Sequence, residues 1–255
     1  MSAWAAMKSS SSQSPGLRDS AWRWWSEAAA GQGAVAASRR FLAAAWEFLR
    51  DSTPRRRRQR YGDADYDWQH RVNTTSAALG WRDRLLGVFH SPYQPTEPVL
   101  FAEMLAALRT LTSIDFRDFV FVDLGSGKGR ALLMASEHPF HRIIGVEILP
   151  TLHHIAQENL AKYRSPTQAC ANLETICADA IEFPLPPEPL LLYLFNPFPE
   201  AGLRRVASRL ERSLCESPRQ VFVLYHNPLL EHVLRESGGL KRIGGTHQYT
   251  IYASG

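Results

Sequence analysis

Apolar residues recur with two different periods between residue 96 and the end of the chain. Helical spacing marks segments at 96–111, 125–136, 150–164, 203–214 and 229–234. Short apolar runs, which are typical of strands, lie at 119–123, 142–147, 173–178, 190–195 and 221–225. The run at 190–195 is apolar on both faces, as a central parallel strand is. These alternating units predict an α/β fold with a doubly wound, mostly parallel sheet.

The ends of this pattern carry two further signals. Thr96 can cap the first helix, in whose first turn Pro98 is tolerated. After the last helix, two glycine-flanked segments at 238–245 and 247–253 predict a closing antiparallel pair of strands. The sheet is therefore expected to be mixed at one edge.

The first 60 residues differ in composition from the rest. They hold 11 Lys and Arg against 4 Asp and Glu, whereas the remainder holds 18 against 21, and all seven tryptophans lie at or before Trp81. We expect residues 1–60 to form a helical, basic N-terminal extension and residues 61–255 to form the catalytic-size domain. The stretch 39–60 could contact an anionic surface; the alternative is a solvated linker.

Composition narrows the class of protein. Of 255 residues, 45% are hydrophobic and 21% charged, which is ordinary for a globular chain. The three cysteines form no CxxC pair, and His153 and His154 are adjacent and cannot share one helix face, so we expect neither disulfides nor a metal. No apolar run approaches the length of a membrane span, and a cytoplasmic location fits best.

The strongest chemical signal is the sequence Asp-Leu-Gly-Ser-Gly-Lys-Gly at 123–129, directly after the first predicted strand. Glycines at alternate positions let the backbone approach a ligand closely. A dinucleotide fingerprint would need a third glycine at position 130, which is Arg130. The spacing instead favours a ligand with an ammonium and a carboxylate, whose amino-acid end Asp123 can contact.

Two more acids follow the next predicted strands. Glu147 ends the second strand, where a carboxylate can accept both hydrogen bonds of a ribose diol. Asp179 follows the third, where it could accept from an adenine amino group. Because open α/β sheets bind ligands at the carboxyl ends of their strands, Asp123, Glu147 and Asp179 are expected to share one site.

Four motifs together resemble class I S-adenosylmethionine-dependent methyltransferases: the 123–129 loop, Gly145-Val146-Glu147, Ala178-Asp179-Ala180 and Asn196-Pro197-Phe198. With Tyr93-Gln94-Pro95-Thr96, the chain is most similar to uncharacterised bacterial members, and more distantly to Dot1-type lysine methyltransferases. The resemblance covers about residues 90–255 well and 61–90 thinly, and the extension lies outside it. It implies a Rossmann-like, seven-stranded sheet and S-adenosyl-L-methionine as cofactor.

The resemblance also assigns residue roles. It places Gly125, Ser126, Gly127 and Gly129 around the methionine part, Glu147 at the ribose and Asp179 at the adenine. Tyr93 and Thr96 would close over the cofactor; the alternative is an aromatic staple and a helix cap. Asn196 and Phe198 would face the acceptor, although the second proline of the amino-methylating motif is absent here.

The sequence therefore predicts a methyltransferase that acts on an N or O nucleophile. The non-basic body favours a protein or small-molecule acceptor over nucleic acid. His226, after the fifth strand, could assist catalysis or be structural. Two alternatives remain at this point: an NAD(P)-dependent oxidoreductase, and a non-catalytic S-adenosylmethionine-binding module.

Overall fold

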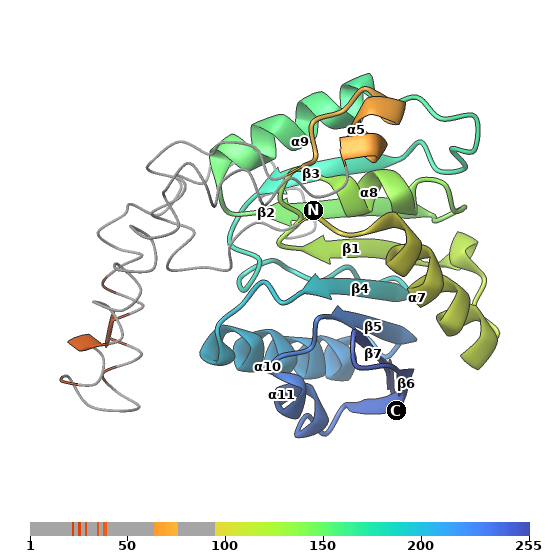
Figure 1. Cartoon of the computed structure of the whole chain (residues 1–255). Coiled ribbons are helices and arrows are strands. Elements are labelled where there is room, and N and C mark those ends of the chain that lie inside the picture. Colours follow the sequence, from red (N-terminus) through yellow and green to blue (C-terminus); the bar gives the residue numbers. More distant parts are fainter. Residues whose placement is uncertain are drawn as a thin grey trace.

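The computed structural model describes residues 64–75 and 95–255, together with isolated positions between 22 and 39 that are helical. Its centre is a seven-stranded sheet with the order β3-β2-β1-β4-β5-β7-β6 (Figure 1). The strands are β1 Val120–Leu124, β2 Arg142–Glu147, β3 Leu173–Cys177, β4 Leu190–Phe195, β5 Val221–His226, β6 Leu240–Gly245 and β7 Tyr249–Ser254. The first five run parallel, and β7 pairs antiparallel with β5 and β6.

Helices fill the connections and cover both faces of the sheet. They are α5 Ala64–His70, α7 Pro98–Leu111, α8 Arg130–Ala135, α9 Pro150–Lys162, α10 Glu200–Glu216 and α11 Glu231–Arg235, with a short 3-10 turn at Phe116–Asp118. Apolar side chains of α5, α7 and α8 join one core cluster, and those of α10 and α11 join the other. Figure 1 shows α5 beside α9, although more than 80 residues separate them in the chain.

The hydrophobic pattern explains these layers. On α10, Leu203, Val206, Ala207 and Leu210 are buried at helical spacing and pack on one face of the sheet. Along β4, alternate side chains enter opposite clusters: Leu191 and Tyr193 face α7 and α8, whereas their neighbours face α10. A strand between two helical layers must be apolar throughout, which is why residues 190–195 carry no charge.

The structure confirms the predicted fold class, including the closing antiparallel pair. β2 and β4 have the predicted bounds, and β1 is displaced by one residue. The predicted cap at Thr96 is wrong: α7 begins at Pro98 after Glu97, and the Thr96 hydroxyl bonds Tyr193 instead. The predicted helical extension, residues 1–60, lies outside the described residues except for the isolated positions named above. Among the described helices, none is long and apolar enough to span a membrane.

Helix α7 offers a direct test of this packing. Met104 is fully buried against the sheet, whereas Val99 on the same helix is 81% exposed. We expect Met104→Ala to lower the free energy of unfolding by about 2–5 kcal/mol, because it leaves a cavity. Val99→Ala is the matched control and should change it by less than about 0.5 kcal/mol. Urea denaturation measures both, and equal effects would contradict this assignment of the core.

Candidate functional site

Two acids meet at the carboxyl edge of the sheet. Asp123 lies in β1 opposite Gly145 of β2, and Glu147 ends β2 two residues later. Both side chains are buried. Burial and the nearby Glu147 carboxylate raise the pKa of Asp123 well above its usual range. The edge thus brings two carboxyl groups together in a place that water barely reaches, where ionisation of both is disfavoured.

Glu147 is satisfied by backbone donors. Its Oε2 accepts the N–H of Gly127 at 2.8 Å, and its Oε1 accepts the N–H of Leu149 at 2.8 Å. Burial raises the pKa of Glu147, and these N–H groups oppose that rise. A carboxylate has about four acceptor positions, so the side chain can still accept from a ligand diol. It also ties the glycine loop to the tip of β2.

Asp123 has no such donors. Burial and Glu147 are the influences on its pKa, and no hydrogen bond from a described residue lowers it, although the residue is only 3% exposed. A buried carboxyl without a donor is costly and marks a place where a ligand donor fits. The ammonium of an amino-acid ligand has three N–H donors and a charge of the right sign.

The third acid, Asp179, lies in a turn after β3. Asp179 follows β3 by two residues and is partly buried. Its Oδ1 accepts the backbone N–H of Ile181 at 3.0 Å, which closes a turn. The backbone of Glu147 accepts the N–H of Ala178 at 3.0 Å, so this turn stays attached to the tip of β2. The three predicted acids therefore belong to the tips of adjacent strands, β3-β2-β1.

The glycine loop turns sharply between β1 and α8. Gly125, Gly127 and Gly129 all have positive φ, at 91°, 55° and 84°. A Cβ at Gly125 would lie 2.6 Å from the Cβ of Pro197, so a side chain there is excluded. Ser126 is buried and its side chain lies against Gly145. Its backbone N–H donates to the carbonyl oxygen of Val146 at 3.0 Å, and its carbonyl oxygen accepts the N–H of Gly129 at 2.8 Å, so the loop holds its own shape.

The contact between Gly125 and Pro197 joins the predicted cofactor loop to the predicted acceptor motif. Asn196 follows β4 in the left-handed region, with φ 45°, and its Oδ1 accepts the Tyr225 hydroxyl at 2.9 Å. Phe198 is half-buried and packs against the cluster under α10. Asn196 therefore lies at the tip of β4, one residue from a direct neighbour of the glycine loop.

A second Asn-Pro turn lies at the neighbouring strand tip. Asn227 follows β5 with φ 49°, and it precedes Pro228 as Asn196 precedes Pro197. The Tyr225 hydroxyl links the two turns, since it donates to Asn196 and accepts the N–H of Leu230 at 3.3 Å. Strained asparagines at two adjacent tips are a feature that the sequence analysis did not single out.

Behind these tips runs a buried chain of polar groups. Thr96 Oγ1 lies 2.9 Å from the Tyr193 hydroxyl, which lies 2.8 Å from His226 Nδ1. Phe195 stacks on the His226 ring at 3.7 Å between centroids. Burial lowers the pKa of His226 to about 4, so its ring is neutral at physiological pH. Tyr193 was missed by the sequence analysis because it lies inside an otherwise apolar strand.

Tyr93 lies outside the described residues. Within the parts of the chain that the structure describes, no group of three His, Cys, Asp or Glu side chains could hold a metal ion.

Residues 117–206, from just before β1 to the start of α10, match a family model described as putative methyltransferase. This stretch, less than half of the chain, is therefore similar to a family of methyltransferases. The buried Asp123 carboxyl, to which no described residue donates a hydrogen bond, fits the ammonium of S-adenosylmethionine. The match covers the glycine loop and the tips of the first four strands, but neither the last three strands nor residues 64–75.

Solved structures with a similar chain path include three methylating enzymes. An RNA methyltransferase from Salinibacter ruber, in complex with S-adenosyl-L-homocysteine, has 22% identity and a TM-score of 0.41, over 63% of this chain and 92% of its own. A precorrin-6y C5,15-methyltransferase from Geobacter metallireducens has 21% identity and a TM-score of 0.44, over 63% and 90%. A predicted N6-adenine-specific DNA methylase from Listeria monocytogenes has 17% and 0.44, over 63% and 51%. These similarities are too low to transfer a substrate. No curated protein matches this chain.

We expect the Asp123 carboxyl to lower the stability of the domain and to strengthen cofactor binding. Because its pKa is raised in the folded domain, the unfolded chain loses its proton first as pH rises above the usual value of 3.8. The free energy of unfolding therefore falls as pH rises from 3.8 toward the raised pKa of Asp123. Below pH 3.8 this carboxyl costs no stability. We expect Asp123→Asn to raise Tm at pH 7, with about 2–4 °C for each kcal/mol in a domain of this size, while weakening cofactor binding.

The control is Asp118→Asn, which changes an exposed acid just before β1. Thermal unfolding and calorimetric titration with S-adenosylmethionine measure the two properties. An Asp123→Asn variant that binds the cofactor as tightly as the native protein would show that this carboxyl is not part of the site.

Proposed function

We propose that this methyltransferase transfers the methyl group of S-adenosylmethionine to an N or O nucleophile of a protein or small molecule. The observation that carries the proposal is the contact between Gly125 and Pro197, together with the buried Asp123 carboxyl, to which no described residue donates a hydrogen bond. It joins a cofactor-type loop to an acceptor-type turn at one sheet edge. Ligands of open α/β sheets bind at this edge.

Four groups would hold the cofactor. Asp123 would accept from the ammonium, and the backbone of Gly125, Ser126, Gly127 and Gly129 would line the methionine part. Glu147, already fixed by two N–H groups, would accept from the ribose hydroxyls. Asp179 would accept from the adenine amino group. Tyr93 and Thr96 would close over the cofactor, and Thr96 is held in place by Tyr193, which lies opposite Asp123 in register.

Asn196 would orient the acceptor. When bound, S-adenosylmethionine supplies a methyl group on an already activated sulfonium, so the protein needs mainly to position a neutral nucleophile. The Asn196 amide is held by the Tyr225 hydroxyl, which leaves one lone pair on Oδ1 for a target N–H or O–H group. Phe198, packed beside it, would supply apolar contact to the acceptor.

His226 would hold Tyr193 rather than remove a proton. A group with a pKa of about 4 is a poor acceptor for the proton of an alkylammonium, whose pKa is about 10.4. The unfavourable difference is about six powers of ten in equilibrium constant. We therefore propose that a lysine acceptor, if there is one, would lose its proton to solvent.

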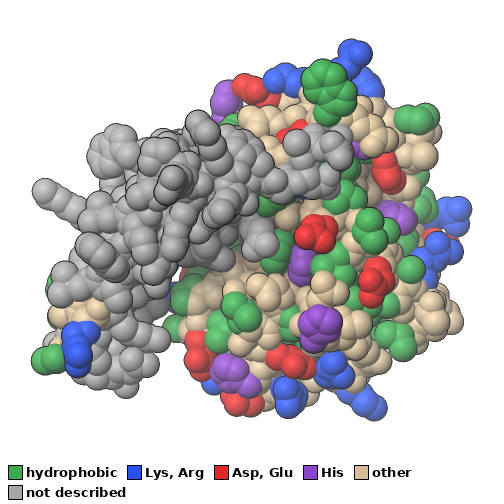
Figure 2. Space-filling model, in the orientation of Figure 1, with side chains coloured by type: hydrophobic (Ala, Val, Ile, Leu, Met, Phe, Trp, Pro, Cys, Tyr) green, Lys and Arg blue, Asp and Glu red, His purple; other side chains and the backbone are tan. Residues whose placement is uncertain are grey.

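Charge favours a neutral or mixed acceptor over a polyanion. From residue 61 onward the chain has 18 basic and 21 acidic residues. In Figure 2, basic and acidic side chains are interspersed on the exposed part of the described face. A nucleic-acid groove normally shows clustered Lys and Arg. These charges therefore favour a protein or small-molecule acceptor.

The assignment of Asn196 is tested by methyl transfer. Extract of source cells that lack this protein is incubated with the pure enzyme and methyl-labelled S-adenosylmethionine. We expect Asn196→Gly to lower labelling about 10- to 100-fold, because a hydrogen bond to a developing charge is worth about 1.5–3 kcal/mol. Glycine keeps the left-handed backbone without strain, so the variant should fold.

Asn227→Gly is the matched control, since the same change is made in the neighbouring turn. It should keep labelling, and both variants should bind S-adenosylmethionine normally. Equal loss in the two variants would refute the role of Asn196, and cofactor binding without labelling by the native enzyme would instead indicate a binding module. A thermal shift with NAD and none with S-adenosylmethionine would indicate an oxidoreductase.

A further inference from the structure

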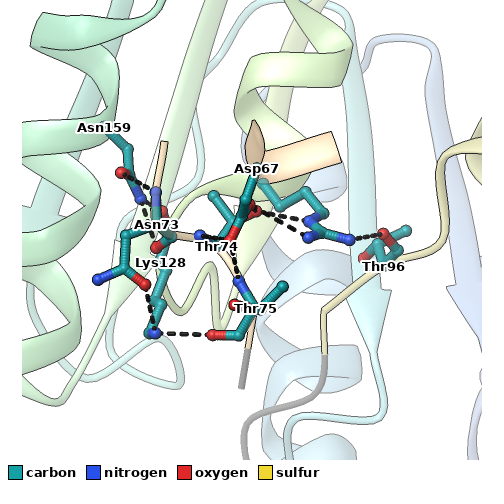
Figure 3. A network of polar contacts seen from close by, with 8 residues as sticks. Asp67, Asn73, Thr74, Thr75, Thr96, Lys128 and Asn159 are labelled. Carbon is teal, nitrogen blue, oxygen red and sulfur yellow. Dashed lines mark hydrogen bonds and ion pairs between the residues drawn. The ribbon is translucent and has the colours of Figure 1, made fainter. Parts of the chain in front are cut away.

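Two cations at the glycine loop are buried against a segment far away in the sequence. Lys128, inside the loop, is fully buried, and Arg130, the first residue of α8, is 2% exposed. Burying a cation is expensive unless it is paired or hydrogen-bonded. Figure 3 shows Lys128 beside residues 73–75, which follow α5. Arg130 also has its partners there, in Asp67 and Thr74.

Lys128 takes part in a closed ring of hydrogen bonds. Its Nζ donates to Asn73 Oδ1 at 3.1 Å and to the carbonyl oxygen of Thr75 at 2.7 Å. Asn159 of α9 donates from Nδ2 to the carbonyl oxygens of both Lys128 and Asn73 at 2.9 Å. The N–H of Asn73 donates to Asn159 Oδ1 at 2.8 Å, which completes the ring. The loop is thus held at both its side chain and its backbone.

Arg130 forms the second connection. Its Nη2 lies 3.3 Å from Asp67 Oδ1, and its Nε donates to Thr74 Oγ1 at 2.6 Å. The guanidinium also lies over the Tyr66 ring, 4.9 Å from the centroid. Asp67 accepts the N–H groups of Thr74 and Thr75 at 2.8 Å, as well as the Thr74 hydroxyl. The anion that balances Arg130 therefore also shapes the segment that binds Lys128.

We infer that residues 67–75 are a clamp that holds the glycine loop in its cofactor-binding shape, with Asn73 and Asp67 as positioning residues. The inference rests on the proposed cofactor site. Lys128 lies between two glycines of positive φ, and a glycine-rich loop loses much conformational freedom when it is ordered. A loop ordered before the cofactor arrives loses less on binding, so the clamp strengthens affinity.

The charge on Lys128 gives the clamp a measurable signature. Burial lowers the pKa of Lys128 to about 8, while Asp67 raises it and Arg130 lowers it. Those two are the charged groups shown to act on it in the described part of the chain; Asn159 on α9 is neutral. Since hydrogen bonds from an ammonium are stronger than those from an amine, the clamp should weaken above this pKa.

The first test removes one contact of the clamp from its solvent side. Asn73 is an exposed residue, so Asn73→Ser should fold normally and change Tm little. We expect the Kd for S-adenosylmethionine to rise about 5- to 30-fold, which corresponds to about 1–2 kcal/mol. Gln69→Ser, an exposed change on α5, is the matched control and should leave Kd unchanged.

The second test uses pH to separate positioning from mere stability. Asn73→Asp places a carboxylate beside the Lys128 ammonium, which raises the pKa of Lys128. We expect native affinity near neutral pH and a loss of affinity that begins at higher pH than in the native protein. The cofactor's own ammonium also titrates, but identically with both proteins, so the difference between their profiles reports Lys128.

The outcomes are distinct. A native-like Kd in Asn73→Ser, or superimposable pH profiles for Asn73→Asp and the native protein, would overturn the clamp. Loss of Tm in parallel with loss of affinity would also overturn it, since that pattern indicates a purely structural role. No binding of S-adenosylmethionine by the native protein would instead overturn the proposed cofactor site.

Discussion

Two carboxylates buried beside each other at the tips of β1 and β2 are the constraint around which the site is arranged. Parallel strands bring their carboxyl ends to one edge, so Asp123 and Glu147 repel each other there. Glu147 is relieved by the N–H groups of Gly127 and Leu149. Asp123 has no equivalent donor in the described chain, and this asymmetry is the basis on which we propose the edge as a site for a cationic ligand.

The glycine loop is therefore held from two sides. On the sheet side, Glu147 accepts the N–H of Gly127. On the opposite side, Lys128 donates to Asn73 and Thr75. Alternating glycine and non-glycine residues make this division possible, because the glycines leave bare backbone while Lys128 supplies a long anchor. Rigidity in this loop comes from the side chains around it, since its glycines supply none.

Hydrophobic pattern predicted the sheet well because the central strands are buried on both faces. A run such as 190–195 has one physical interpretation once helices flank it, and its bounds were right. The three acids were predictable for a related reason, since each follows such a run. The start of α7 was less predictable, because a threonine near the start of a helix is typical of a cap. The Thr96 hydroxyl is instead hydrogen-bonded to Tyr193, 97 residues away.

The clamp could not be predicted from local pattern. Its partners are 53 to 63 residues apart for the Lys128 and Arg130 contacts and 86 for Asn73 and Asn159. Residues 64–75 show no apolar period that would mark them as part of a site. Polar contacts of this kind depend on which side chains the fold brings together, and a single sequence carries no signal for that.

Arg130 stands where a dinucleotide-binding fingerprint has its third glycine, and this difference changes how the loop packs. In a dinucleotide fingerprint the third glycine serves close packing of helix on strand. Here Gly129 and Gly145 provide the close approach: a Cβ at Gly129 would lie 3.3 Å from Ala156, and one at Gly145 would meet Leu132 and Ser126. Position 130 is then free to carry a long side chain, but a buried guanidinium requires an anion. Asp67 supplies it, so α5, which precedes the first strand by about 50 residues, packs as part of the same folded unit as the sheet.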